Sequence, residues 1–168
     1  MEFFEVVEAR ASVRKLEAVE IPEEHLAKIL DAGRRAPSGM NIQPLQYIVV
    51  RDRAMLRKLA RVQEFIPQAS VLVAITADPS ASKYWLEDAA AAAENMLLAV
   101  AALGYASTWV EGTLLRQEAW AKEQLGVPDH LRLIIFLPIG KPAAPPVQAA
   151  KKPLKDLVHR ERFGNRSR

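Results

Sequence analysis

Cysteine is absent from the 168 residues of this chain. Its absence excludes disulfide bonds, thiolate metal sites and a cysteine nucleophile, and it fits the reducing cytoplasm, where we expect the protein. The three histidines, His25, His130 and His159, lie far apart and in no metal-ligand spacing. We therefore expect no metal site and interpret each histidine as a surface or packing residue.

Several other signatures are also missing. No G-x-G-x-x-G follows a strand and no phosphate-binding G-x-x-x-x-G-K-[ST] occurs, so neither a Rossmann fingerprint nor a P-loop is present. No serine lies in a nucleophile-elbow context, which makes a hydrolase triad improbable. The N-terminus lacks the charged and apolar regions of a signal peptide. No single catalytic side chain is predicted.

The net charge of +3 is small for a nucleic-acid-binding protein. We interpret it as local basic sites for a small anion such as a phosphate. A small nucleic-acid module based on the basic tail, residues 160–168, is an alternative. It is disfavoured because no stripe of aromatic and basic residues accompanies the charge, so we expect no nucleic-acid partner.

The most informative segment that is present is the alanine-rich run 85–103. Alanine favours helix, Glu87 and Asp88 suit the first turn, and Gly104 marks the end. Such a helix is apolar almost all round, so it is buried on more than one side. A membrane span is the alternative, but three carboxylates and a marginal length argue against it. We expect no membrane partner, and a second subunit covering one side of the helix.

Around this helix the sequence predicts a single domain, residues 1–168. The run 70–77 is continuously apolar, which predicts a strand buried on both faces and helices on both sides of a sheet. The other expected elements are helices at 2–9, 22–36, 54–62 and 114–125, strands at 47–50, 105–112 and 131–139, and an extended arm at 142–168.

Two short segments carry candidate ligand-binding groups. Arg10, Ser12 and Arg14 alternate, so in an extended chain they share one face and present donors suited to a phosphate or a polar ring edge. A solvated basic turn is the alternative interpretation. The loop 36–44 places Ser38, Asn41 and Gln43 between rigid prolines, which suits a preorganised ligand contact.

The order of the motifs is more specific than any one of them. R-x-S-V-R, A-P-S-x-x-N-x-Q-P before a strand, E-N-M-L-L-A in a helix ending L-G, W-V-E-G, G-K-P, K-K-P-L and H-R-E-R-F-G follow one another along the chain. Together they resemble the nitroreductase family of FMN-dependent oxidoreductases, from Phe3 to Gly164.

The resemblance implies an α+β fold with a mostly antiparallel sheet flanked by helices. It also implies an intertwined homodimer with FMN at the interface, in which the central helix forms much of the contact and the C-terminal arm adds a strand to the partner's sheet. The implied reaction uses NAD(P)H to reduce FMN, which then passes electrons to a nitroaromatic, a quinone or a similar conjugated acceptor.

The resemblance also implies roles for individual residues. Arg10 and Ser12 match residues on the FMN phosphate and ribityl chain, and Arg14 matches a residue near the pyrimidine edge. Glu111 and Gly112 match the segment whose backbone faces the reactive edge of the ring, although Gly112 could simply begin the next helix. The remaining matches are the loop that contacts the flavin of the other subunit, Pro37, Ser38, Gly39 and Asn41, and a late phosphate ligand, Lys151 or its neighbour Lys152.

Three departures bear on activity. Ala11 stands where many members carry Arg or His, Gly39 replaces a common serine, and the linker 77–85 is too short for the helical segment that covers substrate in larger members. The short cover suggests an open active site. It leaves two alternatives open: a protein that stores, senses or delivers FMN with little turnover, and a flavin-dependent dehalogenase or flavin-fragmenting enzyme on the same scaffold.

Overall fold

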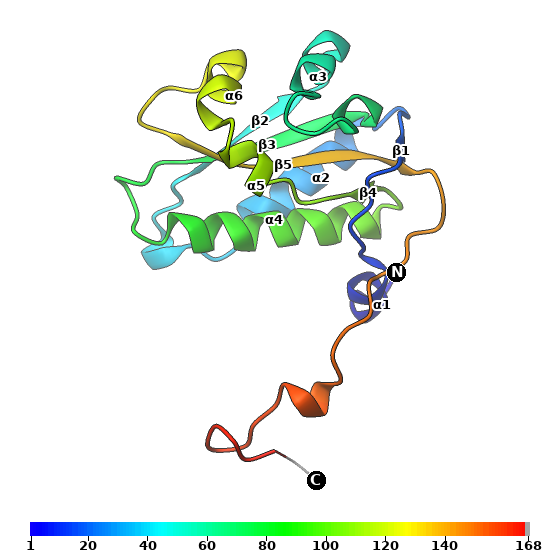
Figure 1. Cartoon of the computed structure of the whole chain (residues 1–168), viewed down its shortest axis with the longest axis vertical. Coiled ribbons are helices and arrows are strands. Elements are labelled where there is room, and N and C mark those ends of the chain that lie inside the picture. The colour runs from blue at the N-terminus through cyan, green and yellow to red at the C-terminus, as the bar shows by residue number, and fades with distance from the viewer. Residues whose placement is uncertain (167–168) are drawn as a thin grey trace.

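A computed structural model, which describes residues 1–166, contains one antiparallel sheet (Figure 1). The strand order is β1-β5-β3-β2, and β4 pairs separately with β5. Every named strand pair is antiparallel, which confirms the sheet expected from the resemblance. The strands are β1 (Leu16–Glu17), β2 (Leu45–Val50), β3 (Val71–Ala77), β4 (Ala106–Ser107) and β5 (Arg132–Pro142).

Helices cover both faces of this sheet (Figure 1). Helices α2 and α4 lie on one face, while α3, α5 and α6 lie on the other. The α-helices are α1 (Phe3–Ala9), α2 (Glu23–Arg34), α3 (Arg53–Leu59), α4 (Trp85–Ala102), α5 (Gly112–Leu115) and α6 (Glu118–Leu125). Three short 3-10 turns complete the set: η1 (Gly39–Asn41), η2 (Ile66–Gln68) and η3 (Leu154–Asp156).

Strand β3 is the centre of the core, and all seven of its residues are buried. Because side chains alternate along a strand, Val73 and Ile75 pack toward α2 and α4, while Leu72 and Ala74 pack toward α3 and α6. The apolar run therefore has the structure that it predicted, a strand with helices on both sides.

Helix α4 packs closely on α2 because Gly33 has no side chain. A Cβ at Gly33 would lie 2.1 Å from Met96 Cε. Met96 and its neighbours toward the sheet are fully buried, but the opposite side of α4 is not. There, Leu98, Ala99 and Ala102 line an open hollow of about 340 Å³ together with Phe3 and other residues. The single chain thus covers the helix on one side only.

The chain beyond β5 leaves the body of the molecule as an arm (Figure 1). Ala143 N still donates to Lys15 O at 3.1 Å, and Gln148 Nε2 donates to Arg10 O at 2.8 Å. Beyond Gln148 the large apolar side chains are exposed, for example Leu154 at 74% and Phe163 at 93%. The arm predicted for 142–168 begins after Pro142, the last residue of β5, and residues 167–168 lie outside the described part.

Two expected elements are wrong. The strand expected at 105–112 pairs only over β4 and at one isolated bridge, Val110 to Phe136, because the backbone at Glu111 (φ −132°, ψ −66°) turns out of the sheet. The helix expected at 114–125 is two helices, since the extended φ of Gln117 (−129°) separates α5 from α6. Gly112 is the first residue of α5.

Within residues 1–166, no helix combines the length and the apolar character needed to cross a membrane.

Candidate flavin site

The N-terminal ligand segment lies beside β4. After α1 the chain runs extended, Val13 N donates to Ser107 O at 2.9 Å, and Ser12 forms a parallel bridge with Ser107. The segment is therefore extended, the condition under which the alternating side chains of Arg10, Ser12 and Arg14 share one face. This pairing brings residues 10–14 next to the segment that leads into Glu111 and Gly112, almost a hundred residues later in the chain.

The donors of this segment are largely available to a ligand. Arg10 Nε lies 3.3 Å from Glu94 Oε1, an ion pair that uses one side of its guanidinium. Within residues 1–166, the side chains of Ser12 and Arg14 have no hydrogen-bond or ion-pair partner. The Ser107 hydroxyl beneath them is buried and also lacks a partner. Two guanidiniums and a hydroxyl suit a phosphate oxygen well.

The neighbouring segment presents backbone rather than side chain. Trp109 Nε1 donates to Glu111 Oε2 at 2.9 Å, which holds the carboxylate against the indole. Gly112 is exposed, and no heavy atom lies within 4 Å of the place where its Cβ would be. A planar ring can therefore approach this backbone closely, because glycine adds no side chain there.

The second ligand segment, the loop 36–44, has an unusual backbone. Met40, Asn41 and Gln43 all have positive φ, between 52° and 57°. Non-glycine residues adopt this region rarely, and such residues concentrate at ligand sites where the surrounding structure holds them. Hydrogen bonds inside the loop help: Gln43 N donates to Ser38 Oγ at 3.2 Å, and Asn41 N donates to Ser38 O at 3.0 Å.

Two residues outside the loop also hold it. Asp88, in the first turn of α4, accepts a hydrogen bond from Gly39 N at 2.9 Å and is 4% exposed. The ring of Tyr84 packs so closely on Gly39 that a Cβ there would lie 2.2 Å from Tyr84 Cδ2. This contact explains why the chain carries glycine at a position where the resemblance leads one to expect serine.

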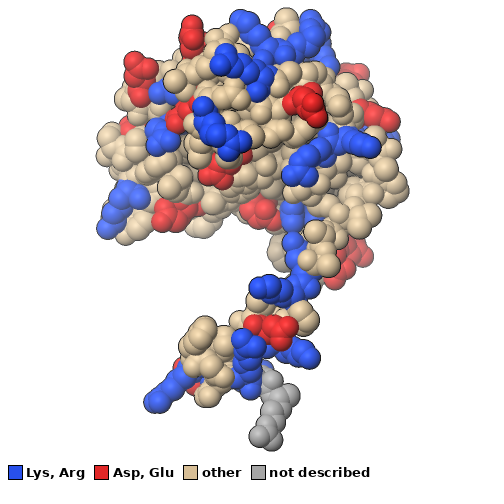
Figure 2. Space-filling model, viewed as in Figure 1, with Lys and Arg blue, Asp and Glu red and all other residues tan. Residues whose placement is uncertain are grey.

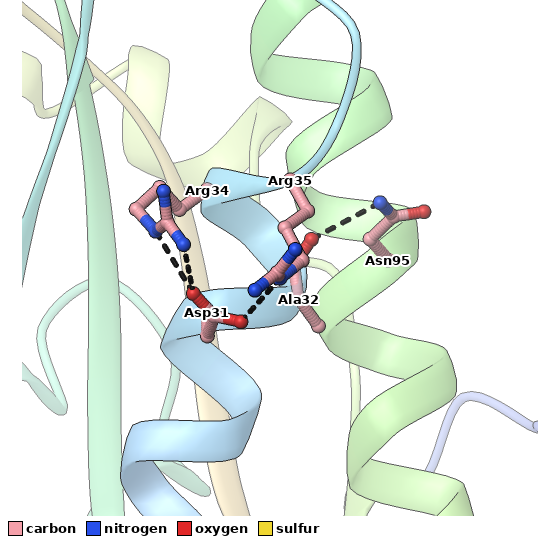
Figure 3. A network of polar contacts seen from close by, with 5 residues as sticks. All are labelled: Asp31, Ala32, Arg34, Arg35 and Asn95. Atoms are coloured by element: carbon pink, nitrogen blue, oxygen red, sulfur yellow. Dashed lines mark hydrogen bonds and ion pairs between the residues drawn. The ribbon is translucent and has the colours of Figure 1, made fainter.

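The end of α2 that leads into the loop is fixed by polar contacts (Figure 3). Asn95 Nδ2 of α4 donates to the Ala32 carbonyl at 3.0 Å, satisfying one of the carbonyls at the end of the helix. Arg34 and Arg35 both bond to Asp31, and these hydrogen bonds, first from Arg35 and then from Arg34, lower the pKa of the Asp31 carboxyl.

A cavity of about 200 Å³ opens between this loop, α2, β2 and α4. Asp88 lies in its wall, and the Oδ2 atom of Asp88 is buried with no hydrogen-bond partner. Burial raises the pKa of Tyr47 on the β2 side of the cavity. The complete lining is Gly33, Arg34, Ala36, Pro37, Ser38, Gln43, Leu45, Tyr47 and Asp88.

The two predicted halves of the site do not meet within one chain. The loop is bonded to Asp88 at the start of α4, whereas Arg10 lines a small cavity with Leu97 and Ala101 near its end. Nine residues separate Asp88 from Leu97, about 14 Å along a helix axis. Arg10, Ser12 and Arg14 lie on the segment that pairs with β4, and Glu111 and Gly112 follow β4 in the chain; we call these five the Arg10 group. Pro37, Ser38, Gly39 and Asn41 lie together in the loop.

The two late lysines belong to neither group in this chain. Lys151 and Lys152 are exposed on the arm, where Figure 2 shows a succession of basic side chains away from the body. Within residues 1–166 neither lysine has a hydrogen-bond or ion-pair partner. Sequence reasoning missed Asp88 and Tyr84 as supports of the loop, and Ser107 as a neighbour of Ser12.

The residues present fit FMN. The Arg10 group supplies unpaired donors for a phosphate beside a backbone open to a ring, and the loop supplies a rigid second surface. The described residues contain no group of three or more His, Cys, Asp or Glu side chains able to hold a metal ion.

The chain is similar in sequence and in fold to known proteins. The sequence profile described as Nitroreductase family matches residues 7–63 and 60–141. A candidate NADH dehydrogenase/NAD(P)H nitroreductase of Archaeoglobus fulgidus is 36% identical over 96% of this chain and 99% of its own. An NADPH-flavin oxidoreductase of Vibrio harveyi is 25% identical over 95% and 73%. The solved structure of an FMN-dependent nitroreductase of Clostridium difficile is 27% identical, with a TM-score of 0.85 over 94% and 98%.

Proposed function

The chain belongs to the nitroreductase family, and from that premise we propose that it is an FMN-dependent oxidoreductase. NAD(P)H is its electron donor, and a nitroaromatic, a quinone or a similar conjugated molecule is its acceptor. The residues 1–168 form a single FMN-binding domain that works in the cytoplasm as a homodimer.

The proposal depends on one observation above all, the pairing of the N-terminal segment with β4. The hydrogen bond from Val13 N to Ser107 O joins the segment of Arg10, Ser12 and Arg14 to β4, whose chain continues to Glu111 and Gly112, and this supports the proposal that the two segments serve one ligand. One contains the unpaired side chains of Ser12 and Arg14, and the other contains the open backbone at Gly112. Cationic and hydroxyl donors followed by a bare backbone suit one elongated molecule with a phosphate tail and a flat ring.

Each residue of this group has a physical role. Arg10 and Ser12 bind the phosphate and the ribityl chain, because a guanidinium and a hydroxyl donate strongly to anionic oxygen. Arg14 lies toward the pyrimidine edge, where a positive charge favours negative charge on the ring. Bound FMN would supply the redox chemistry by accepting hydride from NAD(P)H and passing electrons on. Glu111 and Gly112 orient the ring through their backbone, and solvent supplies the proton.

The second group, Pro37 to Asn41, serves the flavin of the partner subunit. It lies near the other end of α4 from the Arg10 group, so two chains packed through α4 in opposite directions would join the two groups. The open hollow between α1 and α4, lined by Phe3 and Leu98, provides an apolar surface for such packing.

The arm completes the dimer. Strand β2 is the edge of the sheet, with one side unpaired within residues 1–166, and an edge strand can accept another chain. The bare apolar side chains of the arm, Leu154 and Leu157 among them, would be covered in that position. The arm also carries Lys151 and Lys152, of which one reaches the FMN phosphate of the shared site.

The experiment is a titration of the purified protein with FMN, followed by steady-state NADH and NADPH oxidation with menadione or a nitroarene. We expect a yellow dimer with one FMN per chain and turnover with both acceptor classes. Protein that stays colourless and fails to bind added FMN contradicts the proposal. FMN binding with negligible turnover would indicate the storage function instead, and halide release from an iodophenol would indicate the dehalogenase.

A further inference from the structure

We propose that Asp88 is a positioning residue that fixes the shape of the flavin-contacting loop, residues 36–44. The proposal rests on the function proposed above, because it takes this loop as a flavin contact. Asp88 is assigned no contact with FMN itself. It acts through the backbone of Gly39, to which its carboxylate is bonded at 2.9 Å.

The carboxylate is too well buried to be an incidental first-turn residue. Asp88 is 4% exposed, and acidic residues are rarely buried to this extent unless a partner compensates for the lost water. Two features compensate for its burial: the Gly39 N–H donates to Oδ1, and the side chain lies in the first turn of α4. Glu87, one residue earlier, lies in the same turn but is exposed, so burial of Asp88 is not a general property of this turn.

The loop needs such a restraint because its backbone is strained. Three consecutive or near-consecutive residues, Met40, Asn41 and Gln43, hold positive φ. Each such conformation is unfavourable for a residue that has a side chain and persists only where neighbours impose it. The hydrogen bond from Gly39 N enters the loop directly before these residues. The Tyr84 ring presses on the same glycine, so Gly39 is held by both a polar and a packing contact.

The second carboxylate oxygen makes the proposal testable. Asp88 Oδ2 is buried and has no partner, although Asp88 as a residue lines the 200 Å³ cavity. An Asp88→Asn variant keeps the acceptor for Gly39 N at Oδ1. Its amide nitrogen takes the place of Oδ2, which has no hydrogen bond to lose. Asp88→Ala removes the acceptor. The two variants therefore separate the hydrogen bond to the loop from the mere presence of a polar side chain at this position.

The experiment measures amide hydrogen exchange of the full-length apo protein, followed by FMN titration. In Asp88→Ala we expect faster exchange in peptides covering 38–43, unchanged exchange in β3, and an FMN dissociation constant raised at least about tenfold, the scale of one hydrogen bond to a charged group. Asp88→Asn should restore both measurements to near wild type. Glu87→Ala, which removes an exposed carboxylate from the same turn, is the matched control and should change neither.

The outcomes distinguish this proposal from the proposed function. If wild type binds FMN and Asp88→Ala binds it equally well with unchanged loop exchange, Asp88 is not a positioning residue. Equal losses of FMN affinity in Asp88→Ala and Asp88→Asn would also overturn the proposal, because the acceptor that Asp88→Asn retains would then have no effect. If wild type itself does not bind FMN, the proposed function fails, whereas the exchange measurement on the apo protein still tests the restraint of the loop.

Discussion

Arg10→Ala isolates the contact with the flavin phosphate. In the structure its side chain is 20% exposed and its Nε lies 3.3 Å from Glu94, whose own side chain is 49% exposed. Loss of this partly exposed ion pair should cost at most about 1 kcal/mol of folding stability. Loss of a hydrogen bond to a charged ligand costs about 1.5–3 kcal/mol of binding free energy. The dissociation constant for FMN should therefore rise about 10- to 150-fold.

The assay compares FMN with riboflavin, which lacks the phosphate. Apo protein is titrated with each flavin, and binding is followed by quenching of flavin fluorescence. We expect Arg10→Ala to weaken FMN binding and to leave riboflavin binding unchanged, since only the phosphate contact is removed. Arg57→Ala on α3, across the sheet, removes an exposed arginine of the same charge and should affect neither ligand.

Two results would refute this reasoning. Unchanged FMN affinity would mean that Arg10 does not contact the phosphate. An equal loss for FMN and riboflavin would mean that the substitution acts through the structure of the site. A thermal melt of the variant separates the second case, because a general structural defect also lowers the melting temperature.

Three further predictions concern the loop, the ion pair between Glu118 of α6 and Arg132 of β5, and the arm. Gly39→Ser should lower the free energy of unfolding by about 1–3 kcal/mol in urea titration, because its Cβ meets the Tyr84 ring, and Tyr84→Ala in the same chain should recover part of the loss. Burial acts to raise the pKa of Glu118, but hydrogen bonds led by Arg132 outweigh it and lower that pKa. The pair therefore stabilises the fold above the unfolded pKa of 4.5 and loses this contribution as pH falls through the folded value. The melting temperature of Glu118→Gln should be lower than that of wild type at neutral pH, and this difference should disappear in acid. Removal of residues 143–168 should shift the protein toward monomer in light scattering and weaken FMN binding; a truncated dimer with full affinity would contradict the proposed role of the arm.

Much of the fold was predictable because the relevant signals are local. The apolar run of β3 and the alanine-rich run of α4 can each be predicted from the residues of that one segment. The wrong predictions concern segments whose secondary structure depends on tertiary contacts. The residues after β4 have the composition of a strand, yet the turn at Glu111 takes them out of the sheet, and the break at Gln117 coincides with a hydrogen bond from its side chain to Arg61 O.

The site was predictable in part for a similar reason. Alternation indicated only that Arg10, Ser12 and Arg14 would share one face if the segment were extended, and their roles came from the resemblance. Only the position of Asp88 in an acidic first turn could be predicted. Its partner Gly39 lies 49 residues away, and no local pattern predicts their hydrogen bond. The positive φ values of the loop were equally hidden, since Met40 and Gln43 are not residues that favour this conformation.

The central claim is that two chains share each flavin site, and subunit complementation tests this claim most directly. Arg10→Ala carries the defect in one group and Asn41→Ala carries it in the other, so each homodimer has two damaged sites. In a coexpressed mixture, a heterodimer has one intact site and one doubly damaged site. We predict that about one quarter of all sites regain wild-type FMN affinity on random pairing. A mixture that binds FMN no better than the two variants measured separately would contradict a shared site.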